Sequence, residues 1–388
     1  MQEFIFVIKS LPVKIMYVYL QPKYVGKFIC DGKICPANCC RRNWKIEVDA
    51  ETFNKYLQLE SSECELTRHI SFDNGAYFIK QEGGVCPFLN AAGLCSIQLQ
   101  RGEENISQLC RSYPRQLYKF GGIIERSLTL TCPLAARLIL NPKSRIEFET
   151  SEIDLPDWAH RQIFVSQSNV PPEIILYFTE IQFTAISILQ ERRLPIDQRL
   201  IVLGFYLRQL EEIVRRGDFN IITTLNKIYT SEEFFIGQIP ILIDSVNFQP
   251  KEFEMLMSSV LEKIHDGAAQ IYIRHVNLNV DAKTYKKFMK KYAVTLENYL
   301  VNEFFGGVYP YKIGGTIQHN YAVFTVNFKI AETLALSLFP KHSAQIFEML
   351  IELAVDLNHN ETFLAAITDA VKDVADITVL MRKLLRGR

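Results

Sequence analysis

All nine cysteines of this 388-residue chain lie between Cys30 and Cys132, and residues 133–388 contain none. Such segregation is typical of one local framework rather than of thiols scattered through a hydrophobic core. A set of disulfides fits this framework poorly, because the number of cysteines is odd, no export signal is visible and cytosolic thiols stay reduced. The cysteines therefore predict a metal-binding domain in the first third of the chain.

Eight of the nine cysteines are candidate metal ligands, because they form groups that can present thiolates from short loops. They are Cys30, Cys35, Cys39, Cys40, Cys86, Cys95, Cys110 and Cys132. Cys64 has no cysteine near it in the sequence and is interpreted as a buried, inert residue. Thiolate-rich sites select zinc or iron–sulfur clusters, and His69 is the only histidine within the cysteine-bearing span. We therefore predict an iron–sulfur cluster, with structural zinc as the alternative.

The charge balance argues against two classes of partner. Lys plus Arg equals Asp plus Glu at 43 each, so the formal net charge is zero. Broad binding to nucleic acid or to a membrane surface needs a basic field, and we expect neither. The apolar runs at 4–8 and 15–20 are too short for a secretory segment, and no run is long enough to span a membrane. A cytoplasmic protein is expected.

Two kinds of pattern follow each other along the chain. Short strands are predicted at 44–48, at 76–79 and within 117–130, with a short helix after Asp49. From Pro171 onward apolar residues recur at helical intervals, over 174–189, 198–215, 252–264, 284–305, 323–338, 343–357 and 362–385. Asp197, Asp281 and Asn360 are predicted helix caps. The expected fold is α+β and mainly α, with an irregular Cys-rich metal-cluster domain over 1–150 and a helical domain over 151–388.

The cysteine motifs occur in a familiar order. They are Phe28-x-Cys30-x4-Cys35-x3-Cys39-Cys40-x3-Trp44-x-Ile46, Cys86-Pro87-Phe88-Leu89, Gly93-Leu94-Cys95-x-Ile97, Gly102-Glu103, Cys110-Arg111-x-Tyr113-Pro114-Arg115 and Ser127-Leu128-x3-Cys132-Pro133-x-Ala135-Ala136-Arg137. Over about Phe28 to Leu140 this pattern resembles the flagellin lysine-N-methylase family, with a weaker echo at 297–311. Several of the blocks also resemble a broader group of zinc- or iron-chelating domains.

The resemblance implies a chemistry and its cofactors. A member of this family would transfer a methyl group from S-adenosylmethionine to lysine amines on the surface of flagellin, and would carry a [4Fe–4S] cluster held by the motif cysteines. One such cluster needs four ligands and the pattern offers eight. Motif density ranks Cys35, one of Cys39 and Cys40, Cys86, Cys95 and Cys110 above Cys30 and Cys132.

The donor site is not evident from the sequence. Radical enzymes that cleave S-adenosylmethionine use a CxxxCxxC loop, but here Arg42 stands where the third cysteine would follow Cys35 and Cys39. The glycine pairs lack the GxGxxG context of a Rossmann-type methyltransferase. Arg111 and Arg115 have two interpretations: they either clamp the donor carboxylate or hydrogen-bond the cluster sulfurs, or they neutralise the thiolates.

Methylation also requires a neutral lysine amine, because an ammonium group has no lone pair. Tyr113, Tyr118 and Glu125 lie in the motif region and are candidates for taking up the proton, but ordinary packing and surface charge are the favoured explanation for each of them. No general base is therefore named.

Two other functions remain open at this point. The first is a zinc-stabilised module whose helical domain binds a protein partner without catalysis, and the second is an electron-transfer protein. The sequence leaves open which four cysteines act as ligands, how many methyl groups are added and which oligomeric state the chain adopts.

Overall fold

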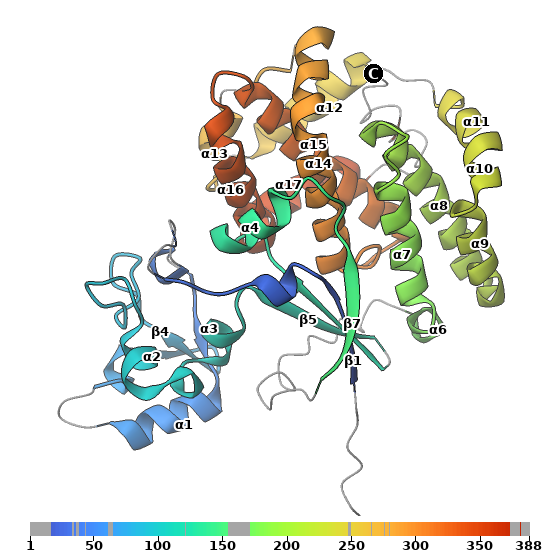
Figure 1. Ribbon diagram of the computed structural model, residues 1–388. Coiled ribbons are helices and arrows are strands. Elements are labelled where there is room, and N and C mark those ends of the chain that lie inside the picture. The colour runs from blue at the N-terminus through green and yellow to red at the C-terminus, as the bar shows by residue number, and fades with distance from the viewer. Residues whose placement is uncertain are drawn as a thin grey trace, which may run out of the picture.

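The computed structural model describes residues 17–32, 35, 39–42, 44–60, 65–120, 122–153, 171–246, 250–264, 266–274, 276–278, 280–372 and 381. A small cysteine-bearing unit lies to one side of a larger unit, which is built from helices and a four-stranded sheet (Figure 1). The predicted fold class, α+β and mainly α, is confirmed.

The small unit, called the metal domain below, has its own core. Its three-stranded sheet has the order β2–β4–β3 and consists of β2 (Glu47–Val48), β3 (Ile70–Asp73) and β4 (Ala76–Ile79). Three short helices complete it: α1 (Ala50–Leu59), α2 (Ser96–Arg101) and α3 (Gln108–Ser112). Its buried cluster runs from Ile46 to Ile106 in sequence and includes the Cys86 side chain. The core is small, so bound metal would add much of the domain's stability.

The four-stranded sheet joins segments that are distant in sequence. It has the order β5–β6–β1–β7 and consists of β1 (Tyr17–Pro22), β5 (Arg115–Phe120), β6 (Ile123–Leu128) and β7 (Phe148–Ile153). β1 runs parallel to β6 and antiparallel to β7. Phe120 stacks on Phe178 at a ring distance of 4.0 Å, and Phe148 meets Phe305 at 5.0 Å. The sheet therefore shares one core with the helices.

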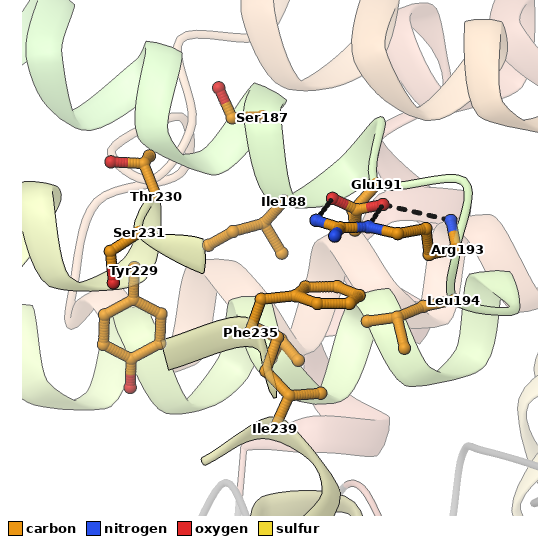
Figure 2. Close-up of a pocket in the computed structure, with 11 residues that line it drawn as sticks. Ser187, Ile188, Glu191, Arg193, Leu194, Tyr229, Thr230, Ser231, Phe235 and Ile239 are labelled. Atoms are coloured by element: carbon orange, nitrogen blue, oxygen red, sulfur yellow. Dashed lines mark hydrogen bonds and ion pairs between the residues drawn. The ribbon is translucent and has the colours of Figure 1, made fainter. Parts of the chain in front are cut away.

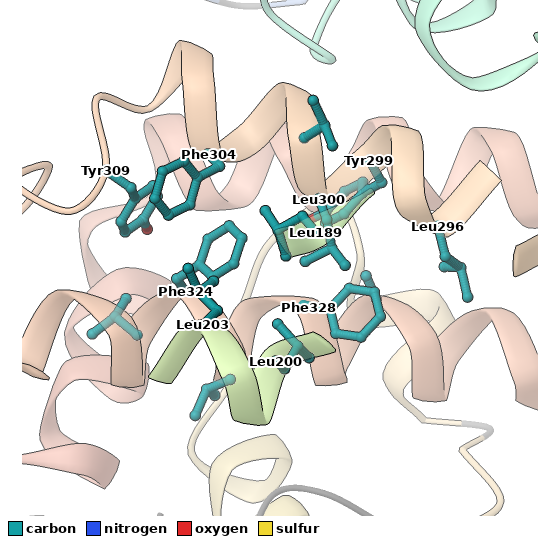
Figure 3. Packing of buried hydrophobic residues seen from close by; sticks show 14 of the residues in the cluster. Leu189, Leu200, Leu203, Leu296, Tyr299, Leu300, Phe304, Tyr309, Phe324 and Phe328 are labelled. Atoms are coloured by element: carbon teal, nitrogen blue, oxygen red, sulfur yellow. The ribbon is translucent and has the colours of Figure 1, made fainter. Parts of the chain in front are cut away.

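The helices of the larger unit follow the predicted periodicity. They are α4 (Pro133–Leu140), α6 (Pro172–Ile175), α7 (Phe178–Leu189), α8 (Ile196–Arg216), α9 (Ile222–Tyr229), α10 (Glu232–Gly237), α11 (Ile239–Asp244), α12 (Pro250–Lys263), α13 (Gln270–Ile273), α14 (Ala282–Gly306), α15 (Ile317–Leu338), α16 (Ile346–His359) and α17 (Glu361–Val371). Aromatic and leucine side chains from α7, α8, α14 and α15 interdigitate at the centre (Figure 3). None of the described helices is long and apolar enough to cross a membrane.

Two of the three predicted caps of these helices are confirmed. Asp281 accepts a hydrogen bond from the Thr284 amide, and Asn360 accepts one from the Phe363 amide. The prediction for Asp197 is wrong, because the N-cap of α8 is Pro195 and Asp197 lies inside the first turn.

Asp197 belongs instead to a buried ionic group at the centre of the larger unit. The Lys329 ammonium donates to Asp197 at 2.5 Å and to Glu332 at 2.8 Å, and the exposed fraction of all three side chains is 3% or less. The Tyr285 hydroxyl adds a hydrogen bond to Glu332 at 3.1 Å. Burial lowers the pKa of Lys329, but the two carboxylates more than offset this effect, so its pKa stands above the usual value. The Lys329 ammonium therefore compensates the charges of two buried carboxylates, Asp197 in α8 and Glu332 in α15.

Candidate metal centre

Six of the eight predicted ligands surround one cavity in the metal domain. Its volume is about 390 Å³. The cysteines that line it are Cys30, Cys39, Cys40, Cys86, Cys95 and Cys110. Apolar side chains, among them Tyr56 and Phe88, form much of the remaining wall. The structure thus brings together thiols that are up to 80 residues apart in sequence.

Tight local turns place these thiols. Cys39 and Cys40 lie in a 3-10 turn (Cys39–Arg41), and the Cys86 amide donates to the Cys40 carbonyl at 2.8 Å. Before Cys95, the Asn90 side chain accepts hydrogen bonds from the Ala92 and Leu94 amides at 3.0 Å each. Asn90 therefore closes the loop that carries Cys95, as Asn side chains often do in turns. Cys110 lies in α3, where Ser107 caps the helix by accepting from the Cys110 amide.

Hydrogen bonds link three of the thiols. Cys40 donates to the sulfurs of Cys39 and Cys86, which raises the pKa of Cys40. The same bonds lower the pKa of Cys86, and they lower that of Cys39 to about 7. Burial raises the pKa of Cys110 to about 12. Because neighbouring thiolates repel one another, a bound cation is what would allow them to ionise together.

Backbone amides influence two of the thiols. Burial raises the pKa of Cys95, and the Gln98 and Ile97 amides oppose this rise. The hydrogen bond from Cys40 lowers the pKa of Cys86, and the Phe88 amide adds to this effect. Neighbouring amides thus favour the thiolate forms of both residues.

Cys35 and Cys132 lie outside the described lining of this cavity. Cys132 is buried at the N-cap of α4, where its side chain forms no capping hydrogen bond. Burial raises its pKa to about 11, and the Cys35 and Cys30 thiols add to this effect. Cys30 therefore lies close to both groups of thiols. Cys64 lies outside the described residues.

The thiols line a cavity and do not converge on one common point. Within the described residues, no three Cys, His, Asp or Glu side chains are grouped closely enough to hold a single metal ion. Which cysteines act as ligands stays a prediction.

The two predicted cofactor-binding arginines have different surroundings. Arg111 donates to the Glu104 and Ile106 carbonyls at 3.4 Å each, so it braces the loop before α3. The Arg115 guanidinium lies 5.1 Å from the centre of the Phe28 ring. Burial raises the pKa of Cys30, and the charge of Arg115 opposes this rise. The contacts of Arg115 thus favour the interpretation that it neutralises thiolate charge, while donor binding by either arginine stays a prediction.

Burial opposes ionisation of all three candidate proton acceptors. Burial raises the pKa of Tyr113, Tyr118 and Glu125. The Tyr113 hydroxyl lies 3.1 Å from the Thr131 hydroxyl oxygen. Glu125 is 1% exposed, and the Gln182 amide nitrogen, oriented to donate, lies 2.7 Å and 3.2 Å from its carboxyl oxygens. The surroundings of all three side chains therefore favour their protonated forms.

The burial of Glu125 predicts a pH-dependent gain in stability for Glu125→Gln. Burial raises its folded-state pKa well above the ordinary value of 4.5. Ionisation therefore destabilises the folded state, by an amount that grows as the pH rises from about 4.5 toward the folded-state pKa. We expect the unfolding free energy of the variant, relative to that of wild type, to increase by at least about 1 kcal/mol as the pH rises from 4 to 8. Urea unfolding at each pH measures this difference. Glu361→Gln, at an exposed site, is the control, and a difference independent of pH would contradict the prediction.

A second cavity lies in the helical region, among α7, α9, α10 and α11 (Figure 2). Its volume is about 170 Å³. The Arg193 guanidinium lies over the Phe235 ring at 3.5 Å and pairs with Glu191 at 2.8 Å. The Tyr229 hydroxyl is buried without a described hydrogen-bond partner. The charged side chains at the edge of this small cavity are therefore already paired with each other, and apolar side chains form part of its lining.

Comparisons with known proteins agree with the motif pattern. A family model described as the FliB lysine N-methylase C-terminal domain matches residues 182–382, just over half of the chain. The flagellar biosynthetic protein FliU of Salmonella muenchen is 33% identical over 132 residues, which cover 31% of this chain and 76% of that protein. No solved structure matches.

Two lysine-N-methylases, from Salmonella typhimurium and Salmonella choleraesuis, are each 32% identical over 132 residues. These matches cover 31% of this chain and 32% of either enzyme, so the alignment spans about a third of their length. The predicted resemblance is confirmed, and the chain belongs to the FliB family of protein-lysine N-methylases.

Proposed function

We propose that this chain methylates lysine side chains of flagellin in the cytoplasm, uses S-adenosylmethionine as the donor and holds a [4Fe–4S] cluster in its cysteine cavity. The observation that carries the cluster is the set of six thiols around one cavity of about 390 Å³. The donor and the target follow from the family to which the chain belongs and from the flagellar name of one relative.

The residues present fit such a cluster. Cysteine thiols are the ligands that iron–sulfur clusters use, and the only described carboxylate in the cavity lining is Asp31. A single zinc ion bound at about 2.3 Å to each sulfur would draw its ligands together and leave little space. The volume between the thiols therefore favours a polynuclear cluster over zinc.

The chain's own residues have distinct roles in this proposal. Four of the cysteines Cys39, Cys40, Cys86, Cys95 and Cys110 would hold the cluster, with Cys30 in the lining of the same cavity. The Ile97, Gln98 and Phe88 amides favour the thiolate forms of Cys95 and Cys86, and the charge of Arg115 favours that of Cys30. When bound, the cluster supplies Lewis-acidic and redox-active iron next to the reacting groups.

Deprotonation of the target lysine rests on desolvation in this proposal. Tyr113, Tyr118 and Glu125 all have raised pKa values, so they act as hydrogen-bond donors or packing groups and not as bases. Removing an amine from water lowers its pKa and frees the lone pair that attacks the methyl group. The proton would then leave to solvent.

Anaerobic purification with metal analysis and an absorption spectrum tests the proposal. We expect about four irons per chain and a broad thiolate-to-iron band near ~400 nm. Mass spectrometry of flagellin incubated with the protein and S-adenosylmethionine should show methylated lysines. A colourless protein that contains zinc in anaerobic as well as aerobic preparations would refute the cluster. Absence of methylation by iron-loaded protein would refute the enzymatic function and leave a binding module.

A further inference from the structure

A further cavity lies where Arg42 of the metal domain meets α4 and α16. Its volume is about 470 Å³. Arg42 of the metal domain, Ala136 and Arg137 of α4, and Phe347, Glu348 and Ile351 of α16 line it together with Glu352. Figure 1 shows α4 beside α16, on the side of the helical unit that faces the metal domain. We propose that this cavity, called the α4–α16 cavity below, binds the methyl donor S-adenosylmethionine; the inference rests on the proposed function.

Two properties, its volume and its lining, distinguish this cavity from the others described. Pockets that enclose ligands of this size have volumes of about 300–1,000 Å³. The cavity of Figure 2 measures about 170 Å³, and one beside Lys23 and Tyr24 measures about 180 Å³. The cysteine cavity is large enough but is lined by the thiols that would hold the metal. The α4–α16 cavity alone among these combines sufficient volume with a wall free of cysteine.

The wall of the α4–α16 cavity matches the parts of the donor. Phe347, Ile351 and Ala136 provide an apolar and aromatic surface against which an adenine ring can pack. Glu348 presents a carboxylate, the group that commonly accepts hydrogen bonds from ribose hydroxyls and also attracts a sulfonium cation. Arg137 presents a guanidinium, which binds a carboxylate through two parallel hydrogen bonds.

Four charged side chains line the cavity: two of them pair with each other, and the other two are available to a ligand. Arg42 donates to Glu352 at 3.0 Å, and the side chains of this pair are 12% and 21% exposed. The pair fixes the metal domain to α16 and is not available to a ligand. Arg137 and Glu348 are exposed, and neither forms an ion pair with another described residue. They are therefore the groups that can receive a zwitterionic ligand.

The position of the cavity suits methyl transfer beside a metal centre. Arg42 follows Cys40 by two residues, and Pro133, which also lines the cavity, directly follows Cys132. The cavity thus adjoins the chain segments that carry thiols from both groups. A donor bound there would lie between the metal domain and the helical domain, where a lysine from a protein substrate can approach from solvent.

Isothermal titration with S-adenosylhomocysteine, the demethylated product, tests the assignment on anaerobically purified full-length protein. We expect Arg137→Ala and Glu348→Gln each to weaken binding by at least about tenfold, since each removes a charged hydrogen-bonding partner. Ala344→Trp places a bulky ring at the exposed rim of the cavity and should weaken binding without changing a charge. Arg274→Ala and Glu361→Gln, at exposed sites elsewhere, should bind like wild type. The absorption band and the unfolding midpoint of each variant verify that metal and fold are retained.

The outcomes separate the inference from the proposed function. Wild-type protein that contains metal but binds neither S-adenosylhomocysteine nor S-adenosylmethionine would refute the proposed function. Wild-type binding that all three cavity variants retain would refute the α4–α16 cavity alone. Retained affinity together with a changed spectrum on adding S-adenosylmethionine would place the donor on the metal and also overturn the assignment.

Discussion

Under the proposed function, the Cys86→Ser variant is expected to lose the cluster and, with it, at least about 100-fold of the rate of lysine methylation. Cys86 is buried, its sulfur receives hydrogen bonds from Cys40 and from the Phe88 amide, and it lies in the wall of the cysteine cavity. A serine oxygen is a harder and less readily ionised ligand than a thiolate, so it binds iron–sulfur clusters poorly. The measurement is iron per chain and rate of lysine methylation, side by side.

Two further variants make this result specific. Cys95→Ser removes another thiol of the same cavity and should have the same effect, which would show that the loss is not peculiar to one position. Cys64→Ser is the matched control, because Cys64 has no other cysteine near it in the sequence and is not among the predicted ligands. Full iron content and full activity in Cys86→Ser would remove Cys86 from the site. Far-ultraviolet circular dichroism distinguishes loss of metal from loss of the helical fold.

The Lys329→Met variant is expected to lose about 3–5 kcal/mol of unfolding free energy. Methionine fills a similar volume, but it leaves Asp197 and Glu332 buried with no cation between them. Removing one partner of a buried ionic group costs far more than the group contributes, because the remaining charges stay desolvated. Urea unfolding at pH 7, followed by circular dichroism, measures the change.

Matched variants identify the physical cause. Lys287→Met, at an exposed position of α14, should change stability by less than about 0.5 kcal/mol. Adding Asp197→Asn and Glu332→Gln to Lys329→Met should restore most of the loss, because the uncompensated charges are then gone. If Lys329→Met loses less than about 1 kcal/mol of unfolding free energy, other groups compensate the charges of the two carboxylates and the prediction is wrong.

Local signals in the sequence were sufficient for several parts of the molecule. The spacing of the cysteines and the clustering of eight of them near turns predicted a common site, and six of them line one cavity. The helical intervals after Pro171 and the caps at Asp281 and Asn360 predicted helices that the structure contains. The helices and their caps depend on residues within a few positions of each other, so a short stretch of sequence holds the information for them.

The tertiary structure was needed wherever distant segments meet. The same capping signal that is correct at Asp281 is wrong at Asp197, because Lys329, 132 residues away, buries that carboxylate in an ion pair. The pairing of β1 with β6 and β7, the burial of Glu125 beside Gln182 and the contact of Arg42 with Glu352 likewise join residues far apart in the chain. The cavity between α4 and α16 exists only through that packing. Composition and spacing therefore indicate which chemical groups the chain has, but burial and long-range contact determine which of them are charged, paired or open to a ligand.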